Sequence, residues 1–557
     1  MLKRFGSISA ILFSASFAAT AAAAPYGSGT GYDRDTGDIT STPVVVALAS
    51  GIDLDRGTLT IKGGSGNDVA SVAPGSLRGT IVAKRGVYTS TFNASDVSKI
   101  IFYGNDGDDH FTNTTSIPSE AYGGDGNDVL NGGSGADFLV GGYGQDTVRG
   151  YAGNDTIWGS GGSDWLYGGE GNDLVKGHGG NDLMYGENGE DRLYGGTGDD
   201  TLYGGNHQDT LVSIGGGYDT VSGYYGNDFF WIDSTDWVSD AGAEENLGAF
   251  INRVPAFFSV SYNGGSSSTP IAKDLVNYDL PDPLSDNWDV DLVNFGDRPL
   301  FSSVGPNKED VMQGGTGDCY ILGPLAAVAD ATPESIKKLV VDLDDGTYAV
   351  RFYRTEGGAA EYVRVDADLW VAEGTQVPEF GKLSLVEDAI WLPIVEKAWA
   401  LFRNQVGTYA SISGGHNGLG GTIGFGADND VRYEIDDAVY DAQAIINWHN
   451  AGRPAGATAN YINTTVPQLL NWIADRQDEG RPVYTGNKSG ASNTTAFDLD
   501  NWRRGQHIIM IDRVNFDANG NPVSLVLRDQ IGPTYRVITD WARIYFLVGR
   551  AYIYDMP

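Results

Sequence analysis

Between residues 104 and 228 apolar side chains recur every nine residues in a sequence dominated by glycine and aspartate. In the unit Gly123-Gly-Asp-Gly-Asn-Asp-Val-Leu-Asn131, an apolar residue follows the second aspartate by two places. This spacing predicts one buried position per repeat, with glycines allowing tight turns between short strands. A disordered glycine-rich linker would have no reason to keep such a fixed spacing. The predicted buried residues are Leu130, Leu139, Val148, Ile157, Leu166, Val175, Met184, Leu193, Leu202 and Leu211.

The repeats also align a series of carboxylates that are candidate calcium ligands, because Ca²⁺ prefers oxygen donors. The pattern resembles the RTX nonapeptide repeat, and this resemblance implies a right-handed parallel β-roll that binds calcium between successive turns. Weaker copies surround Asp109 and Asp228, and an isolated copy contains Asp68. The aspartates in strict register are Asp128, Asp137, Asp146, Asp155, Asp164, Asp173, Asp182, Asp191, Asp200 and Asp209.

Other segments show shorter periodicities. Residues 39–103 alternate apolar and polar side chains and predict a β-rich cap on the roll. Alternation at 346–353 and 361–366 predicts two paired strands, and residues 385–402 have helical periodicity. Residues 234–285 are rich in Ser, Asn, Asp and Pro, which is typical of a connector or of a partly ordered extension of the following domain.

The N-terminus has the features of a signal peptide. Lys3 and Arg4 precede an apolar run, and Ala21 to Ala24 supply a small-residue cleavage region. No later apolar segment reaches the length of a membrane span, so we expect a secreted, extracellular protein. The single cysteine excludes an internal disulfide. The net charge of −37 argues against a nucleic-acid partner and favours bound cations.

That single cysteine, Cys319, stands where a glycine-rich turn meets an apolar run. A helix beginning there would lower the pKa of the thiol through its unpaired N–H groups, with Asp318 as a possible cap. Gln313 could return over the turn, so that its side-chain N–H and the Cys319 backbone N–H form an oxyanion hole. We therefore interpret Cys319 as a nucleophile rather than as a small buried hydrophobe.

The stretch Gln313-Gly-Gly-Thr-Gly-Asp-Cys-Tyr320 resembles the motif that opens the catalytic core of calpain-like cysteine peptidases, although that family usually has Trp where this chain has Tyr320. Residues 391–400, Tyr409 and the pair Gly414-Gly415 resemble later motifs of the same family in the same order. The resemblance extends from about Asp286 to the C-terminus. It implies a papain-like α+β fold with two lobes.

The second lobe should supply a base, and His507 is the best of the six histidines because it opens an apolar strand. The next strand, joined to the first through the hairpin signal Asp517-Ala-Asn-Gly520, ends at Asp529. In calpain-like enzymes an asparagine occupies the place of Asp529; an aspartate can equally accept from the imidazole and fix its tautomer. His416, in a glycine-rich segment, is the competing base.

The sequence thus predicts a multidomain protein, a parallel β-roll followed by an α+β papain-like two-lobed cysteine peptidase. Its expected function is a secreted calcium-binding endopeptidase that cleaves protein or peptide substrates with Cys319, His507, Asp529 and Gln313. The alternatives are a calcium-dependent adhesion or matrix protein with an inactive peptidase-like domain, and a thioester-forming acyl transferase. The predicted parts are a signal peptide (1–24), a β-rich cap (25–103), the roll (104–233), a linker (234–285) and two peptidase lobes (286–425 and 426–557).

Overall fold

The computed structural model describes residues 51–240, 250–260, 266–269, 280, 290–312, 319–353, 359–378, 382–383, 387–404, 466–479, 483–486, 508–529, 534–539 and 551–553. The chain divides into two units, residues 1–47 and 48–557, and all described residues belong to the second. The predicted signal peptide lies outside the described residues. None of the described helices has both the length and the apolar character needed to cross a membrane.

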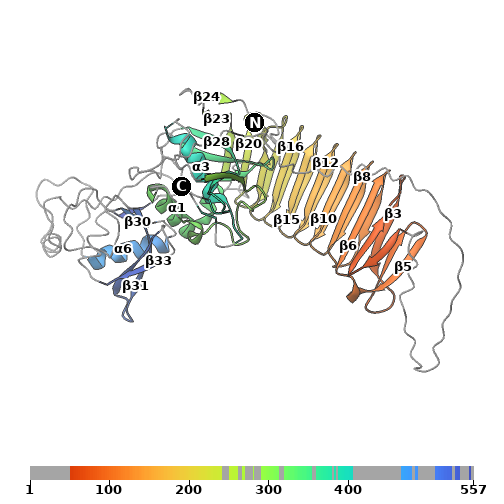
Figure 1. The fold of residues 1–557 in the computed structure, drawn as a ribbon, viewed down its shortest axis with the longest axis horizontal. Helices are drawn as coiled ribbons and strands as arrows, with labels where there is room; N and C mark the ends of the chain where they lie inside the picture. The colour runs from red at the N-terminus through yellow and green to blue at the C-terminus, as the bar shows by residue number, and fades with distance from the viewer. Residues whose placement is uncertain are drawn as a thin grey trace, which may run out of the picture. The chain divides into compact units, whose positions relative to one another are not determined.

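Two sheets of parallel strands form the N-terminal half of the second unit (Figure 1). Successive strands alternate between the sheets, so that two nine-residue repeats complete one turn. The first sheet has the order β1 (Ile52–Asp55), β2 (Thr58–Lys62), β6 (Lys99–Asp106), β8 (Ser119–Asp125), β10 (Phe138–Tyr143), β12 (Thr156–Gly161), β14 (Leu174–Gly179), β16 (Arg192–Thr197), β18 (Thr210–Ser213), β20 (Phe229–Asp233) and β22 (Phe250–Val254).

The second sheet faces the first across the interior of the roll, and both sheets contribute to one apolar core. Its order is β21 (Trp237–Val238), β19 (Thr220–Tyr225), β17 (Thr201–Asn206), β15 (Leu183–Asn188), β13 (Trp165–Glu170), β11 (Thr147–Ala152), β9 (Val129–Gly133), β7 (His110–Asn113), β3 (Val69–Pro74), β4 (Thr80–Arg85) and β5 (Tyr88–Asn93).

The core of the roll consists of the apolar residues predicted from the repeat, and all ten are fully buried. Leu139 of β10 lies in register with Ala121 on one side and Ile157 on the other, so identical repeat positions stack along the sheet. The predicted parallel β-roll is therefore confirmed. A thin interior of this kind holds only one large apolar side chain per strand, and the turns must be stabilised by other means.

At the N-terminal end the sheets change character. β2 pairs in parallel with β6, and β3 with β7, but β1–β2 and β3–β4–β5 are antiparallel. A short 3₁₀ turn (η1, Ala94–Asp96) leads from β5 into β6. Leu59, Val72 and Phe102 continue the apolar core into this region.

The segment expected as a connector contributes strands to both neighbours. β22 pairs in parallel with β20 as the last strand of the first roll sheet. Only two residues later, β23 (Phe257–Val260) pairs in parallel with β28 (Ala360–Asp366) of the following domain and antiparallel with β24 (Ser266–Thr269). The chain therefore passes from the roll into the next sheet almost without a loop.

The next domain begins with the sheet β24-β23-β28-β27-β26, in which β26 is Val340–Asp342 and β27 is Thr347–Tyr353. The antiparallel pairing of β27 with β28 confirms the predicted strand pair. A second small sheet pairs β25 (Val290–Asn294) with β29 (Asp368–Ala372). The described helices of this region are α1 (Cys319–Ala331), α2 (Pro333–Lys337) and α3 (Trp391–Asn404), with a 3₁₀ turn η3 (Lys308–Asp310) before α1.

α1 is buried on all sides from Ile321 to Ala329, which is typical of a helix at the centre of a domain. α3 begins six residues later than the periodicity predicted, and Pro393 lies in its first turn, where a missing N–H is tolerated. Both helices share an apolar core with β27 and β28.

A five-stranded sheet forms the C-terminal region, in the order β33 (Thr534–Ile538), β32 (Pro522–Asp529), β31 (Ile508–Phe516), β30 (Val483–Gly486) and β34 (Ala551–Ile553). The predicted hairpin is confirmed, because β31 and β32 are antiparallel and Asp517 closes the turn by accepting from the N–H groups of Asn519 and Asn521. α6 (Val466–Asp478) packs on this sheet. The predicted order of a roll followed by an α+β region is thus confirmed.

An apolar contact joins the roll to the β26–β28 sheet. Trp231 of β20 is fully buried and meets Tyr362 of β28 edge to face, with ring centroids 6.0 Å apart. Val212, Val254 and Ala349 belong to the same buried cluster. The contact is therefore a packed interface rather than a chance approach of two domains.

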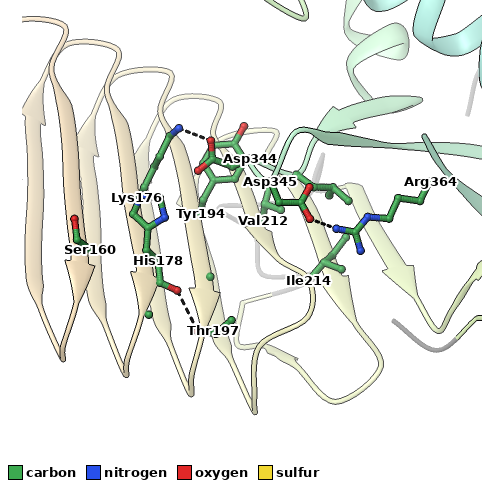
Figure 2. A pocket seen from close by; sticks show the side chains of 13 residues that line it. Ser160, Lys176, His178, Tyr194, Thr197, Val212, Ile214, Asp344, Asp345 and Arg364 are labelled. Atoms are coloured by element: carbon green, nitrogen blue, oxygen red, sulfur yellow. Dashed lines mark hydrogen bonds and ion pairs between the residues drawn. The ribbon is translucent and has the colours of Figure 1, made fainter. Parts of the chain in front are cut away.

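A pocket of about 330 Å³ lies beside this interface (Figure 2). On the roll side Lys176 forms an ion pair with Asp344, which belongs to the turn between β26 and β27. On the other side Arg364 of β28 pairs with Asp345 of the same turn. The cations lining the pocket are thus already neutralised by neighbouring carboxylates.

Candidate calcium ladder and candidate peptidase site

The repeat aspartates form two ladders along the roll. In one, the backbone N–H of Asp128 donates to Oδ1 of Asp146 at 2.8 Å, and the N–H of Asp146 donates to Oδ1 of Asp164 at 2.8 Å. In the other, Asp137 and Asp155 make the same contact at 2.8 Å. Each carboxylate therefore fixes the backbone of the turn 18 residues earlier with one oxygen only.

The second oxygen of each carboxylate is buried and has no hydrogen-bond partner among the described residues. Such an orphaned acceptor is costly unless something else binds it. The aspartates with a buried, unpartnered Oδ2 are Asp109, Asp128, Asp137, Asp146, Asp155, Asp164, Asp173, Asp182, Asp191, Asp200, Asp209 and Asp219.

Burial also disfavours the charged form of these carboxyl groups. Desolvation raises the pKa of Asp128 to about 6 and that of Asp173 to about 8. It raises the pKa of Asp209 to about 9, with the neighbouring carboxylates of Asp191 and Asp228 adding to the effect. A bound cation would reverse both contributions, because it compensates the lost hydration and the mutual repulsion.

Glycines lie directly beside the orphaned oxygens. A Cβ built on Gly123 would lie 2.1 Å from Oδ2 of Asp128 and 2.4 Å from the carbonyl oxygen of Gly141. At Gly150 the corresponding distances are 2.1 Å to Oδ2 of Asp155 and 2.6 Å to the oxygen of Gly168. A side chain at either position would thus clash with these oxygens, so only glycine lets the carboxylate oxygen and the carbonyl oxygen of a neighbouring turn lie so close together.

Carbonyl donors are needed to complete such sites, because nowhere in the described part of the chain do three carboxylate, imidazole or thiol groups gather around one point. One carboxylate oxygen with several backbone carbonyls is a ligand set that suits Ca²⁺ and does not suit metals that prefer nitrogen or sulfur. The ten predicted aspartates therefore fit calcium.

The ladders extend beyond the strict nine-residue register. Asp109 donates its N–H to Oδ1 of Asp128, and Asp200 donates to Oδ1 of Asp219. Both steps span 19 residues instead of 18, so an inserted residue shifts the register without breaking the ladder. Asp219 was missed in the sequence for this reason. Allowing one insertion per turn while keeping the apolar residue two places later would have found it.

The predicted nucleophile begins a helix. Cys319 is the first residue of α1, as expected, and the apolar residues after it are buried. The side chain of Cys319, and the whole of Gln313 and Asp318, lie outside the described residues. Their predicted roles remain predictions.

The predicted base, His507, and its predicted partner, Asp529, lie next to or at the ends of two strands. Asp529 is the last residue of β32, and β31 begins at Ile508, the residue after His507 in the sequence. Met510 of β31 is paired with Arg528 of β32. His507, the competing His416 and the side chain of Asp529 lie outside the described residues.

The elements that carry these residues converge. α1 packs against β31, and Met510 is buried in the same apolar cluster as Ile321 and Leu322. Lys308 of η3 connects the two elements, because its Nζ lies 2.9 Å from Oδ1 of Asp330 in α1 and 2.5 Å from Oδ1 of Asp512 in β31.

The chain that leads to Gln313 is held by the N-terminal cap of η3 and by a contact with α3. The Asn307 side chain accepts from the Glu309 N–H, and the Asn307 N–H donates to Asp310 in return. The buried carboxylate of Asp310 also accepts from the indole N–H of Trp391 at 2.9 Å. Trp391 belongs to residues 391–400, the segment that resembles a later motif of calpain-like peptidases. This segment therefore supports the chain before the cysteine.

Lys397, in the same segment 391–400, also stabilises the fold. Lys397 is fully buried, and its Nζ lies 2.5 Å from Oδ1 of Asp366 and 2.7 Å from the carbonyl oxygen of Asp368. A buried ammonium paired in this way holds α3 against β28.

Together these observations define a calcium-binding β-roll joined to an α+β domain with a cysteine at the start of its central helix. Comparison with known proteins agrees for both parts. The RTX calcium-binding nonapeptide repeat family matches residues 122–157, 158–193 and 185–213, and the calpain family of cysteine proteases matches residues 288–428. The chain thus combines RTX repeats with a calpain-family cysteine protease domain.

Individual calpain-type proteins show the same relationship. The chain is 27% identical over 192 residues to the calpain-type cysteine protease DEK1 of Zea mays, a match that covers 32% of this chain and 8% of the maize protein. It is 33% identical over 127 residues to the calpain-2 catalytic subunit of Bos taurus, which covers 21% of this chain and 17% of the bovine protein. The chain therefore corresponds to a small part of these relatives.

Proposed function

We propose that this protein is a secreted, calcium-binding cysteine endopeptidase. The calpain-family match and the position of Cys319 at the start of a buried helix support the peptidase activity. The orphaned carboxylate oxygens and the RTX match support calcium binding by the roll. Export is supported by the signal-like N-terminus and by the RTX repeats, which are typical of secreted proteins.

In the proposed reaction His507 removes the proton of the Cys319 thiol, and the thiolate attacks the carbonyl carbon of a peptide bond. Gln313 and the backbone N–H of Cys319 stabilise the resulting oxyanion. His507 then donates its proton to the leaving amine as the C–N bond breaks. Water hydrolyses the thioester, and Asp529 orients the imidazole throughout.

One observation carries this proposal: α1, which begins at Cys319, packs against β31, which begins immediately after His507. Elements nearly 190 residues apart in the sequence are thereby brought into contact, and the thiol and the imidazole are expected next to them in the sequence. Asp529 ends the strand that is paired with β31.

The experiment is cleavage of casein by the full-length protein in millimolar calcium. Cys319→Ala and His507→Ala should each reduce the cleavage rate by about 10³-fold or more, since thiolate and base act as a unit. Thr375→Ala, a change in an exposed turn, is the control and should retain full activity. Undiminished cleavage by Cys319→Ala would refute the proposal.

A further inference from the structure

Arg528 is a fully buried cation whose contacts leave its own sheet. It lies on β32 directly before Asp529. Its Nη1 donates to the carbonyl oxygen of Val311 at 3.3 Å, and its Nη2 lies 3.4 Å from Oε2 of Glu309. These partners are more than 210 residues away, in the short segment that precedes Gln313.

Glu309 has a second partner on the same sheet. The hydroxyl of Tyr535, on β33, donates to Oε1 of Glu309. The two carboxylate oxygens are therefore bound by two adjacent strands of the C-terminal sheet. Burial of the phenol and this carboxylate together raise the pKa of Tyr535 to about 12, so the hydroxyl stays a donor at neutral pH.

A guanidinium group is well suited to this contact, because its planar donors can bind a carbonyl and a carboxylate at once while remaining charged. The cost of burying it is offset only if these partners are kept. Glu309 is 38% exposed, but breaking the contact would leave the fully buried Arg528 without its carboxylate partner and should therefore change the position of the segment.

We propose that Glu309, Arg528 and Tyr535 form a latch between the lobes that positions the chain entering the cysteine loop against the strands that carry the base and its orienting residue. The inference rests on the proposed function, and all three are positioning residues. None needs to touch the substrate. The latch sets how closely the thiol of Cys319 approaches the imidazole of His507.

The residues in contact are close in sequence to the residues proposed for catalysis. Val311 lies two residues before Gln313, and Arg528 lies one residue before Asp529. A single buried side chain thus connects the backbone next to the oxyanion donor with the strand end next to the orienting carboxylate. A shift of either element would separate thiol from base, and the pKa of the thiol rises when the nearby imidazolium is lost.

The test uses the fact that Cys319 is the only cysteine, so alkylation of the full-length protein by iodoacetamide reports on this thiol alone. Glu309→Gln keeps the shape and removes the charge, and Tyr535→Phe removes one hydroxyl. Glu334→Gln is the matched control, because Glu334 forms an ion pair with Lys337 in the same domain at 3.0 Å. Far-UV circular dichroism verifies that each variant is folded.

In the wild type, alkylation should remain fast at pH 6. Glu309→Gln should lower the alkylation rate at pH 6 by about 10-fold or more as the thiol pKa moves toward its free value. Tyr535→Phe should lower it by about 3-fold, the effect of one hydrogen bond. In peptide cleavage both variants should reduce kcat while leaving KM nearly unchanged, and Glu334→Gln should match the wild type.

The outcomes separate the two proposals. If the wild type alkylates as an ordinary thiol and Cys319→Ala still cleaves casein, the proposed function is wrong. If the wild type is active with a low thiol pKa but Glu309→Gln and Tyr535→Phe leave alkylation and kcat unchanged, the latch is refuted. An equal loss in Glu334→Gln would also refute it, because the effect would then reflect general weakening of the domain.

Discussion

The roll and the peptidase region differ in the sequence distance of the contacts that hold them. In the roll, a typical hydrogen bond such as that from Asp128 to Asp146 spans 18 residues. In the peptidase region, Lys308 meets Asp512 across 204 residues and Arg528 meets Val311 across 217. The first kind of contact repeats with the sequence, whereas the second depends on the whole domain being assembled.

The two regions also differ in what they bury. The roll surrounds two rows of apolar side chains, one from each sheet, with carboxyl groups whose pKa is raised by burial. In the peptidase region, the buried charges described above are paired within the protein, as Lys397 is with Asp366. The roll thus lacks a counter-charge that calcium would supply, whereas these buried charges of the peptidase region have counter-charges within the protein.

Removal of calcium should therefore have the largest effect and should divide the two regions. In chelator we expect the roll over residues 104–230 to lose its strand structure, because its aspartates repel one another and its glycine-rich backbone is costly to order. Hydrogen exchange measured by mass spectrometry on the full-length protein should show the roll amides losing protection, while β31 and β32 retain it.

The strands next to the roll should show an intermediate change in hydrogen exchange. β26, β27 and β28 should lose part of their protection, since β23 extends their sheet directly from the roll and Trp231 packs against Tyr362. Unchanged protection of the roll in chelator would contradict the calcium assignment. Complete loss across β31 and β32 would mean that the peptidase region also depends on calcium.

The sequence predicted the strands and the buried positions of the roll almost residue by residue, since its period is local. The calcium ligands remain a prediction. The sequence pattern missed Asp219, where one residue is inserted, and the strands β21 and β22, which follow the predicted end of the roll at residue 233. In the peptidase region it predicted the strands, the hairpin and the helix that begins at Cys319. It could not predict the contacts of Lys308, Glu309 or Arg528, because nothing in their local sequence specifies partners two hundred residues away.

The strands that join the two regions could not be predicted from the sequence either. Residues 250–260 lie in a stretch rich in polar residues and proline, yet they form β22 and β23. Their pairing depends on edges that the roll and the β26–β28 sheet present to them. Arg351 shows how closely they are bound, because it donates to Asn252 at 3.1 Å and covers the ring of Phe250.

Trp231→Ala should produce the second largest effect, because it removes the centre of this junction. Deleting a fully buried tryptophan costs about 3–5 kcal/mol of the free energy of unfolding. Trp237→Ala is the control, since Trp237 is 67% exposed and its loss should change stability by less than ~0.5 kcal/mol. Both are measured by urea unfolding in saturating calcium, followed by far-UV circular dichroism. Equal midpoints for the two variants would mean that the junction is not a packed interface.

Lys176→Met should have the smallest effect, roughly 1 kcal/mol or less, as is usual for ion pairs near the surface. The pair with Asp344 joins the roll to the β26–β27 turn (Figure 2). The side chains of Lys176 and Asp344 are only 13% and 21% exposed, so the loss should be measurable at low salt and smaller at high salt. Methionine keeps the length of the side chain, but the substitution also removes the cation–π contacts of Nζ with Trp158 and Tyr194.

The pair of Lys176 with Asp344 is tested with a control variant, Lys99→Met, and by comparing hydrogen exchange with and without calcium. Lys99→Met breaks the pair of Lys99 with Glu120, which lies entirely within the roll, and should not affect the β26–β27 turn. If Lys176 stabilises the junction, its substitution should increase hydrogen exchange of residues 340–353 in calcium and have no further effect in chelator, where the roll no longer presents Lys176 to Asp344. An equal increase with and without calcium would show that the effect arises elsewhere, and that the roll and the peptidase region are coupled by apolar packing alone.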